Sequence, residues 1–216
     1  MEFIQQLFDF VLHIDKHLFE IVNKYDKITY VILALIIFCE TGLVVTPFLP
    51  GDSLLFAAGM VAGAGMLSLG LLIVILFAAA VIGDNLNFTI GNKIGHLLIQ
   101  SKRRWMKKEY LDRTHAFYEK HGGKTVIIAR FVPIIRTFAP FVAGLGSMTY
   151  NRFLLFCLAG NMIWILTFSL AGYALGNNEW VKGHFTLVTL GIIGLSVVPI
   201  VIGIIKQYLS KLKIGS

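Results

Sequence analysis

The sequence predicts an all-α polytopic membrane protein, with about four transmembrane helices and two opposed re-entrant hairpins arranged as an inverted repeat. Three observations favour this fold class: an apolar composition, the lengths of the apolar stretches, and a similarity between the two halves of the chain. Of the 216 residues, 56% are hydrophobic and only 14% are charged, and the mean hydropathy is +0.77. Soluble domains are about 25% charged. The composition therefore excludes a cytosolic enzyme, a nucleic-acid-binding module and a secreted disulfide scaffold.

The N-terminal segment, residues 1–27, is predicted to be amphipathic and not to span the membrane. In residues 3–22, apolar side chains recur at helical spacing opposite a charged face. This pattern is typical of a helix that lies on a membrane surface or on the rest of the protein.

Residues 28–205 are predicted to form one transmembrane domain. Residues 28–49 are apolar except for Glu40, and the chain is then interrupted by Pro47, Pro50 and Gly51. The next apolar run, residues 53–66, has 14 residues, which is too short to cross a hydrocarbon core of about 30 Å. Residues 67–90 are long enough to cross.

The charge distribution predicts which loops are cytoplasmic. Residues 102–124 contain eight Lys or Arg residues against three acidic ones, and the tail, residues 206–216, is also basic. Such segments next to membrane helices lie on the cytoplasmic side. If residues 153–176 and 185–205 both cross, residues 125–149 must begin and end inside. We expect this segment, with its breaks at Pro133 and Pro140, to be a re-entrant hairpin that lines a cavity.

The two halves of the chain resemble each other. Asp52 precedes Gly59 by seven residues, Arg136 precedes Gly144 by eight, and a spanning helix follows in both halves. The number of predicted crossings between the two hairpins implies that they enter the membrane from opposite sides. Opposed, Pro- and Gly-interrupted segments at matching positions are typical of an inverted-repeat transporter with a site near the bilayer midplane. Chance similarity between Gly- and Ala-rich stretches is the alternative.

Ionisable residues occur within the predicted membrane segments: Glu40, Asp52, Arg130 and Arg136, with Asp84 as a possible fifth. Each costs at least about 2.5–3.5 kcal/mol at a helix centre, so they must pair or face water. The first half contributes the acids and the second half the arginines, as expected if opposed hairpins meet. Two buried salt bridges without a transport role are the alternative interpretation.

Arginine suits the binding of a phosphate, because its planar fork can hold two oxygens at once and stays charged. Arg130 and Arg136 are therefore the candidate ligands of an anionic substrate. Glu40 and Asp52 are candidates for holding these arginines when the site is empty, and for taking up or releasing a proton as the anion exchanges.

Several motifs together resemble the DedA family of bacterial inner-membrane proteins, also described as SNARE-associated or VTT-domain proteins. They are residues 39–42 (CETG), 47–52 (PFLPGD), 83–84 (GD), 91–95 (GNKIG) and 129–140 (ARFVPIIRTFAP). The resemblance runs from about residue 3 to the last helix. It implies a transporter related to eukaryotic lipid scramblases that returns undecaprenyl phosphate across the inner membrane, with a link to the proton-motive force. It also implies that Glu40, Asp52, Arg130 and Arg136 are functional. Asn92 stands where relatives often have Arg, so no ligand role is assigned to it.

Other classes of function compete with transport as interpretations of the sequence. Asp52 and Asp84 could form an aspartyl protease dyad in the membrane, but the fuller GxGD pattern is missing, and the sequence has neither a GxSxG elbow nor an HExxH motif. We therefore expect no enzymatic activity. A proton-dependent carrier of a small ion or drug remains open, as does a structural membrane protein. We expect membrane lipids and protons as partners, a possible homo-oligomer, and no nucleic acid, cofactor or metal. Trp164 lies within a predicted span and is assigned to the core.

Overall fold

The computed structural model describes residues 14–43, 51–100, 133–146, 148–176 and 178–184, with isolated positions at 127, 130, 187, 188, 190, 191 and 194. Every regular element in these ranges is an α-helix. The helices are α2 (Ile14–Tyr25), α3 (Ile28–Gly42), α4 (Gly51–Gly63), α5 (Leu69–Gln100), α8 (Pro133–Leu145), α9 (Tyr150–Leu175) and α10 (Glu179–Gly183).

The N-terminal amphipathic segment is described from residue 14 onward. Helix α2 buries Leu18 and Val22 and exposes Glu20, so it has one apolar face, as the sequence predicts. The helix ends at Tyr25, three residues later than expected, and a turn at Asp26 (φ 44°) leads into α3. Helix α3 ends at Gly42, before the predicted limit of residue 49, and residues 44–50 lie outside the described ranges.

Among the described residues, two helices are apolar and long enough to cross a membrane, α5 over Leu69–Gly95 and α9 over Tyr150–Leu175. At 1.5 Å per residue, each is about 40 Å long, against a hydrocarbon core of about 30 Å. Helix α5 continues to Gln100, beyond the predicted end at residue 90. The described part of the chain also contains shorter apolar helices at Ile28–Gly42, Gly51–Gly63 and Ile135–Leu145. The predicted polar segment 102–124 and most of the predicted crossing 185–205 lie outside the described residues.

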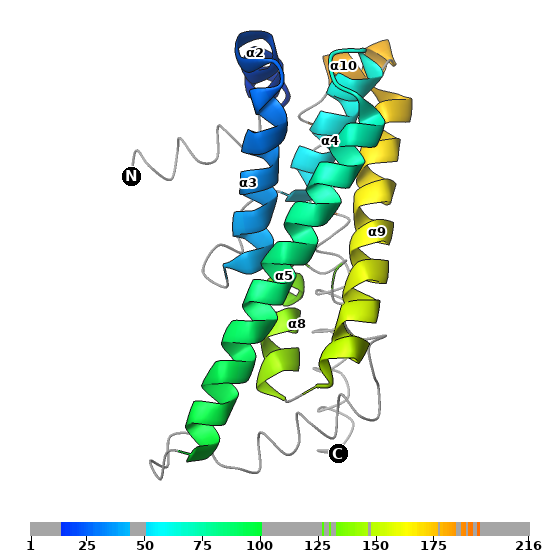
Figure 1. The fold of residues 1–216 in the computed structure, drawn as a ribbon. Helices are drawn as coiled ribbons and strands as arrows, with labels where there is room; N and C mark the ends of the chain where they lie inside the picture. Colours follow the sequence, from blue (N-terminus) through cyan, green and yellow to red (C-terminus); the bar gives the residue numbers. More distant parts are fainter. Residues whose placement is uncertain are drawn as a thin grey trace, which may run out of the picture.

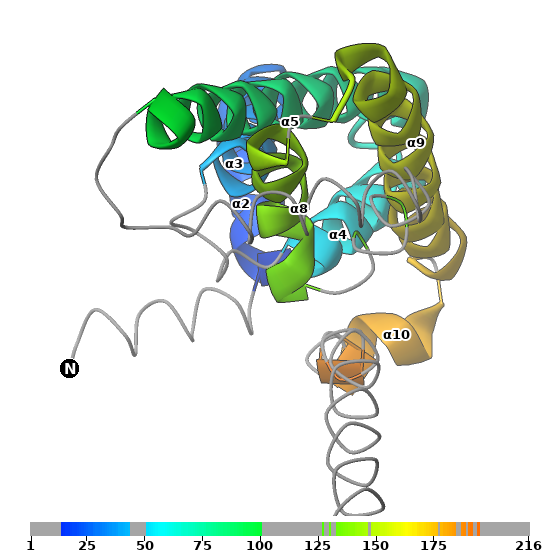
Figure 2. The same ribbon diagram turned by 90° about the horizontal axis from the view of Figure 1, so that it is seen from below.

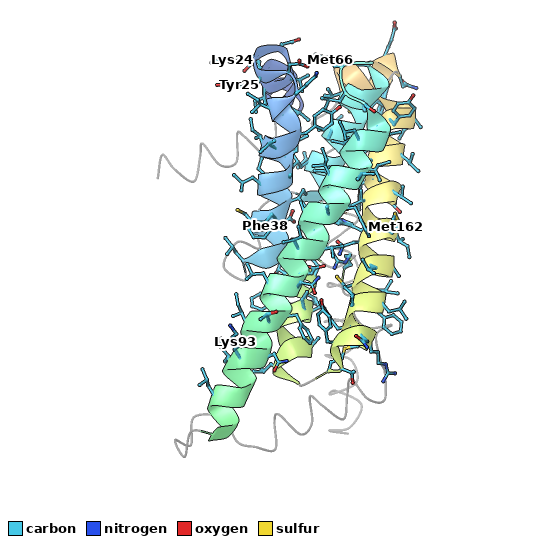
Figure 3. The ribbon with its side chains drawn as sticks, in the orientation of Figure 1. Lys24, Tyr25, Phe38, Met66, Lys93 and Met162 are labelled. Atoms are coloured by element: carbon cyan, nitrogen blue, oxygen red, sulfur yellow. The ribbon has the colours of Figure 1, made fainter. Side chains whose placement is uncertain are left out.

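The outer surface of the bundle is apolar at mid-height and charged near the ends. Figure 3 shows Lys24 and Lys93 toward opposite ends, with Phe38 and Met162 between them. Large apolar side chains such as Val31, Val74 and Leu155 point outward and are between 64% and 66% exposed. A soluble monomer rarely exposes so much contiguous apolar surface, so this surface is suited to lipid.

The short helices of each half pack against the long helix of the other half. Helix α4 packs against α9 and α8 packs against α5, and the helices of each pair are neighbours in both views of the ribbon (Figure 1, Figure 2). Because α5 and α9 run in opposite directions, α4 and α8 also point in opposite directions. Each half is therefore incomplete by itself and is covered by the other.

Glycines allow these helices to touch through their backbones. A Cβ added at Gly172 would contact the backbone of Phe56 on α4, and one at Gly91 would contact the backbone of Phe141 on α8. A similar contact occurs one turn further along α5, where Gly95 lies against the backbone of Leu145 on α8. The two interfaces are thus built from equivalent positions, which agrees with the similarity of the two halves in sequence.

One predicted hairpin break is wrong. Pro140 lies inside α8, which continues to Leu145. A proline removes one helical hydrogen bond, here the N–H that would bond to the carbonyl of Arg136, but it does not have to end the helix. Pro133 begins α8 and Gly51 begins α4, whereas Pro47 and Pro50 lie outside the described residues.

Candidate functional site

The ionisable residues singled out in the sequence are all buried at the middle of the bundle. Their side chains are 13% exposed or less. They come from the end of α3, the start of α4, the midpoint of α5, the turn before α8, and the first turns of α8. In that order they are Glu40, Asp52, Asp84, Arg130 and Arg136.

Arg136 is held by two carboxylates. Its Nη1 is paired with Oδ1 of Asp52, and its Nη2 is paired with Oε1 of Glu40. The three residues are up to 96 positions apart in the chain. The guanidinium thus binds two carboxylate oxygens through two of its nitrogens, the pattern in which arginine also binds a phosphate.

A second cluster surrounds Arg130. Its Nη2 is paired with Oδ2 of Asp84, and its Nη1 donates to Oδ1 of Asn161 at 2.6 Å. Oδ2 of Asp84 also accepts hydrogen bonds from Nδ2 of Asn161 at 2.8 Å and from the Cys157 thiol at 3.2 Å. Asp84 therefore has three donors, while Nε of Arg130 is buried with no hydrogen-bond partner in the described part of the chain.

Trp164 lies between the two clusters and contacts both. Its Nε1 donates to Oδ1 of Asp52 at 2.7 Å. The Cζ atoms of Arg136 and Arg130 lie 5.1 Å and 6.0 Å from the centroid of its ring, within the range of a cation–π interaction. The side chain is almost completely buried, at 1% exposed.

Small residues allow the clusters to form. A Cβ added at Gly51 would lie 2.6 Å from Cδ of Glu40, so a larger residue there would displace the carboxylate. Gly160 similarly faces Arg130, and a Cβ added there would lie 3.2 Å from Nε. Gly42 and Gly83 bring α3 and α5 into backbone contact beside the site. A Cβ added at Gly42 would lie 3.1 Å from Cα of Gly83.

The N-terminal ends of two helices meet at the Arg136 cluster. Asp52 is in the first turn of α4, and Arg136 is the fourth residue of α8. Helix N-termini carry partial positive charge and unpaired N–H groups, and they favour anions. Together with the guanidinium, they make this part of the bundle strongly attractive to negative charge, which Glu40 and Asp52 supply in this structure.

Known proteins were compared with this chain. The family model of the VTT domain matches residues 49–174. Protein DedA of Escherichia coli is 51% identical over 210 residues, which is 96% of this chain and 96% of that protein. This chain belongs to the DedA family. An uncharacterized membrane protein of Mycobacterium leprae is 41% identical over 82% of the chain and 79% of its own length. The inner membrane protein YqjA of Escherichia coli is 33% identical over 68% of the chain and 67% of its own length. No solved structure matches.

As a member of the DedA family, the chain is a membrane protein. The region matched by the family model contains α4, α5, α8 and all of α9 except Leu175, together with Asp52, Asp84, Arg130 and Arg136. Glu40 lies outside that region, on α3, and reaches the site from there.

The structure distributes the predicted residues differently from the expectation that Glu40 and Asp52 would hold both arginines. Both acids bind Arg136, whereas Arg130 is paired with Asp84. Sequence reasoning missed Asn161 and assigned Trp164 to the core. A polar side chain within the apolar run 153–176 was the available signal for Asn161. Nothing in the sequence distinguishes Trp164 from a tryptophan that only packs.

Proposed function

We propose that this protein translocates an anionic lipid across the membrane, with undecaprenyl phosphate or a related anionic phospholipid as its substrate, and that Arg136 binds the phosphate headgroup. The observation that carries the proposal is the pairing of the buried Arg136 with two separate carboxylates where the N-termini of α4 and α8 meet. Two phosphate oxygens can replace the two carboxylate oxygens on the guanidinium. Arg130, on the other side of Trp164, supplies a second positive charge near the path.

The proposed transport cycle uses the opposed halves of the chain. Helices α4 and α8 are the membrane-embedded arms of two re-entrant hairpins, and with four spanning helices they form an inverted repeat around the site. The C-terminus lies in the cytoplasm. The headgroup moves between the halves while the polyprenyl tail stays in the bilayer, because no free energy is gained by moving an apolar tail through a polar site.

The surroundings of the aspartates favour transport over hydrolysis. Asp52 binds Arg136 and Trp164, and Asp84 binds Arg130, Asn161 and Cys157. An aspartyl protease needs two carboxyl groups that share one proton, whereas these two carboxyl groups bind different arginines.

The test uses purified protein in liposomes that contain undecaprenyl phosphate, with and without a pH gradient. Headgroup exposure on the outer leaflet is followed over time for wild type, Arg136→Ala and Arg152→Ala. Arg152 is the matched control because it is an exposed arginine on α9. We expect Arg136→Ala to lose the accelerated exchange and Arg152→Ala to keep it.

The outcomes separate the possible functions. Dependence of the rate on the gradient would identify energised transport, and independence would identify scrambling. If folded wild-type protein gives no acceleration, the lipid assignment is wrong. In that case the same liposomes, loaded with inorganic phosphate, test a small anion as the cargo.

A further inference from the structure

Asp52 and Glu40 both bind Arg136, but their other surroundings differ. Oδ1 of Asp52 also accepts the Trp164 indole N–H at 2.7 Å. Asp52 lies in the first turn of α4, where the unpaired backbone N–H groups and the helix dipole stabilise a negative charge. Asp52 therefore has stabilising neighbours that do not depend on Arg136.

Glu40 shares the start of α4 with Asp52, because its carboxylate lies against Gly51, but its other neighbours are less favourable. It lies in the last turn of α3, where the carbonyl end of the helix disfavours a negative charge. Arg136 supplies the one side-chain donor that reaches it in the described ranges, and beside Arg136 the carboxylate has the backbone of Gly51 as its neighbour. The side chain is 1% exposed.

The charged groups around Glu40 do not replace Arg136. From α4 it faces Asp52, which has the same charge. Helix α5 contributes Asp84, whose charge is balanced by Arg130. Helix α2 lies at the far end of α3 (Figure 1). Among the described residues, Glu40 therefore relies on one cation, Arg136.

We propose that Trp164 is a positioning residue that keeps Asp52 ionised and thereby assigns the exchangeable proton to Glu40. The inference rests on the proposed function, in which Arg136 leaves its carboxylates to bind an anionic headgroup. When this happens, both carboxylates keep the α4 terminus, but Asp52 also keeps the Trp164 N–H, while Glu40 loses its cation and its side-chain donor. A buried carboxylate without a counter-ion takes up a proton, because an isolated charge is very costly in a low-dielectric interior.

The exchange balances in atoms and charge. As one singly charged anion binds Arg136, one proton from solution bonds to the Glu40 carboxylate, and it returns to solution when the anion leaves. The net charge of the site is the same in both states. Trp164 does not ionise, and its ring stays beside both guanidinium groups, so its hydrogen bond to Asp52 is available throughout the cycle.

A test without any ligand uses Arg136→Gln, which removes the cation permanently. Infrared spectroscopy of the purified, monodisperse protein at neutral pH detects a protonated carboxyl group by its C=O stretch. Compared with wild type, we expect Arg136→Gln to gain this band. The band should vanish when Glu40→Gln is added and should remain when Asp52→Asn is added. No band in Arg136→Gln, or a band that survives Glu40→Gln, would overturn the assignment.

The role of Trp164 is tested in the double variant Arg136→Gln/Glu40→Gln. Adding Trp164→Phe keeps the aromatic ring but removes the N–H, so Asp52 should become protonated and the band should return. Adding Trp180→Phe is the matched control, because this tryptophan is 60% exposed on α10, and the band should stay absent. If Trp164→Phe gives no band in a folded protein, Trp164 does not control the ionisation of Asp52.

A second measurement uses protein with Arg136 intact. Dodecyl phosphate in detergent, or inorganic phosphate in a parallel sample, is added to wild type and to Glu40→Gln. We expect a carboxyl band in wild type with dodecyl phosphate that is absent from Glu40→Gln, and a band that persists in Glu40→Gln would contradict the proposal. If neither probe binds wild type while Arg136→Gln still shows the Glu40 band, the anion-binding function fails and the assignment of the proton stands.

Discussion

The ion pair between Asp84 and Arg130 allows the cost of burying charge in this bundle to be measured. The change Asp84→Asn keeps the shape of the side chain but leaves Arg130, 4% exposed, without a counter-ion. Removing one partner of a buried pair destabilises a protein by about 3–5 kcal/mol. Because Nε of Arg130 already lacks a partner in the described region, we expect a loss of stability near the upper end of this range, about 5 kcal/mol.

Removing the other partner, in Arg130→Met, should lower the free energy of unfolding by a smaller amount. Asp84 keeps hydrogen bonds from Asn161 at 2.8 Å and Cys157 at 3.2 Å, so we expect about 3 kcal/mol. The double variant carries neither charge and leaves only neutral polar groups imperfectly paired, at a cost of about 1–3 kcal/mol. The two single losses would add to about 8 kcal/mol, so the coupling should be at least about 5 kcal/mol.

The assay is reversible unfolding of the purified protein in mixed micelles of a mild detergent and SDS. The control cycle is Tyr150→Phe with Asn85→Ala, which removes an exposed hydrogen bond of 2.9 Å between α9 and α5, one residue along α5 from Asp84. Its coupling should not exceed about 1.5 kcal/mol. If the losses at Asp84 and Arg130 add to within about 0.5 kcal/mol, the two charges do not stabilise each other and the reasoning is refuted.

Two further predictions concern the packing around the site. Gly172→Ala should destabilise the protein by about 1–3 kcal/mol, because the added Cβ would overlap the backbone of α4. Gly70→Ala, with open space around it, should be neutral or stabilising by up to about 1 kcal/mol, and thermal unfolding in detergent measures both. Asn87→Leu should cost at least about 2 kcal/mol in the same assay, since the Asn87 amide donates to the carbonyls of Thr41 at 3.0 Å and Thr137 at 2.7 Å. A loss below about 0.5 kcal/mol would show that these carbonyls find other donors.

The sequence was sufficient to select the charged residues of the site, because an ionisable side chain in an apolar segment is rare and costly. It also located the segments that hold them, since hydrophobic length and proline or glycine breaks are local properties. It was less reliable for helix ends. Pro140 was interpreted as a break, but a helix whose remaining bonds and packing are intact can continue through one proline.

Which carboxylate pairs with which arginine cannot be predicted from the sequence. With Glu40, Asp52 and Asp84 available to two arginines, several pairings satisfy the charges equally well. The observed pairing depends on how α3, α5 and α9 cross α4 and α8, and those crossings depend on glycine contacts between residues distant in the chain, such as Gly172 and Phe56. Trp164 gained its polar role in the same way, because Asp52 lies 112 residues from it in the chain.

The class of protein, the apolar segments and the similarity of the two halves therefore follow from composition and local spacing, because lipid imposes the same requirement on every residue within it. Which carboxylate binds which arginine, and which aromatic ring lies between them, was decided by tertiary packing. These contacts join side chains from different helices over a few ångströms, where a shift of one turn would replace every partner.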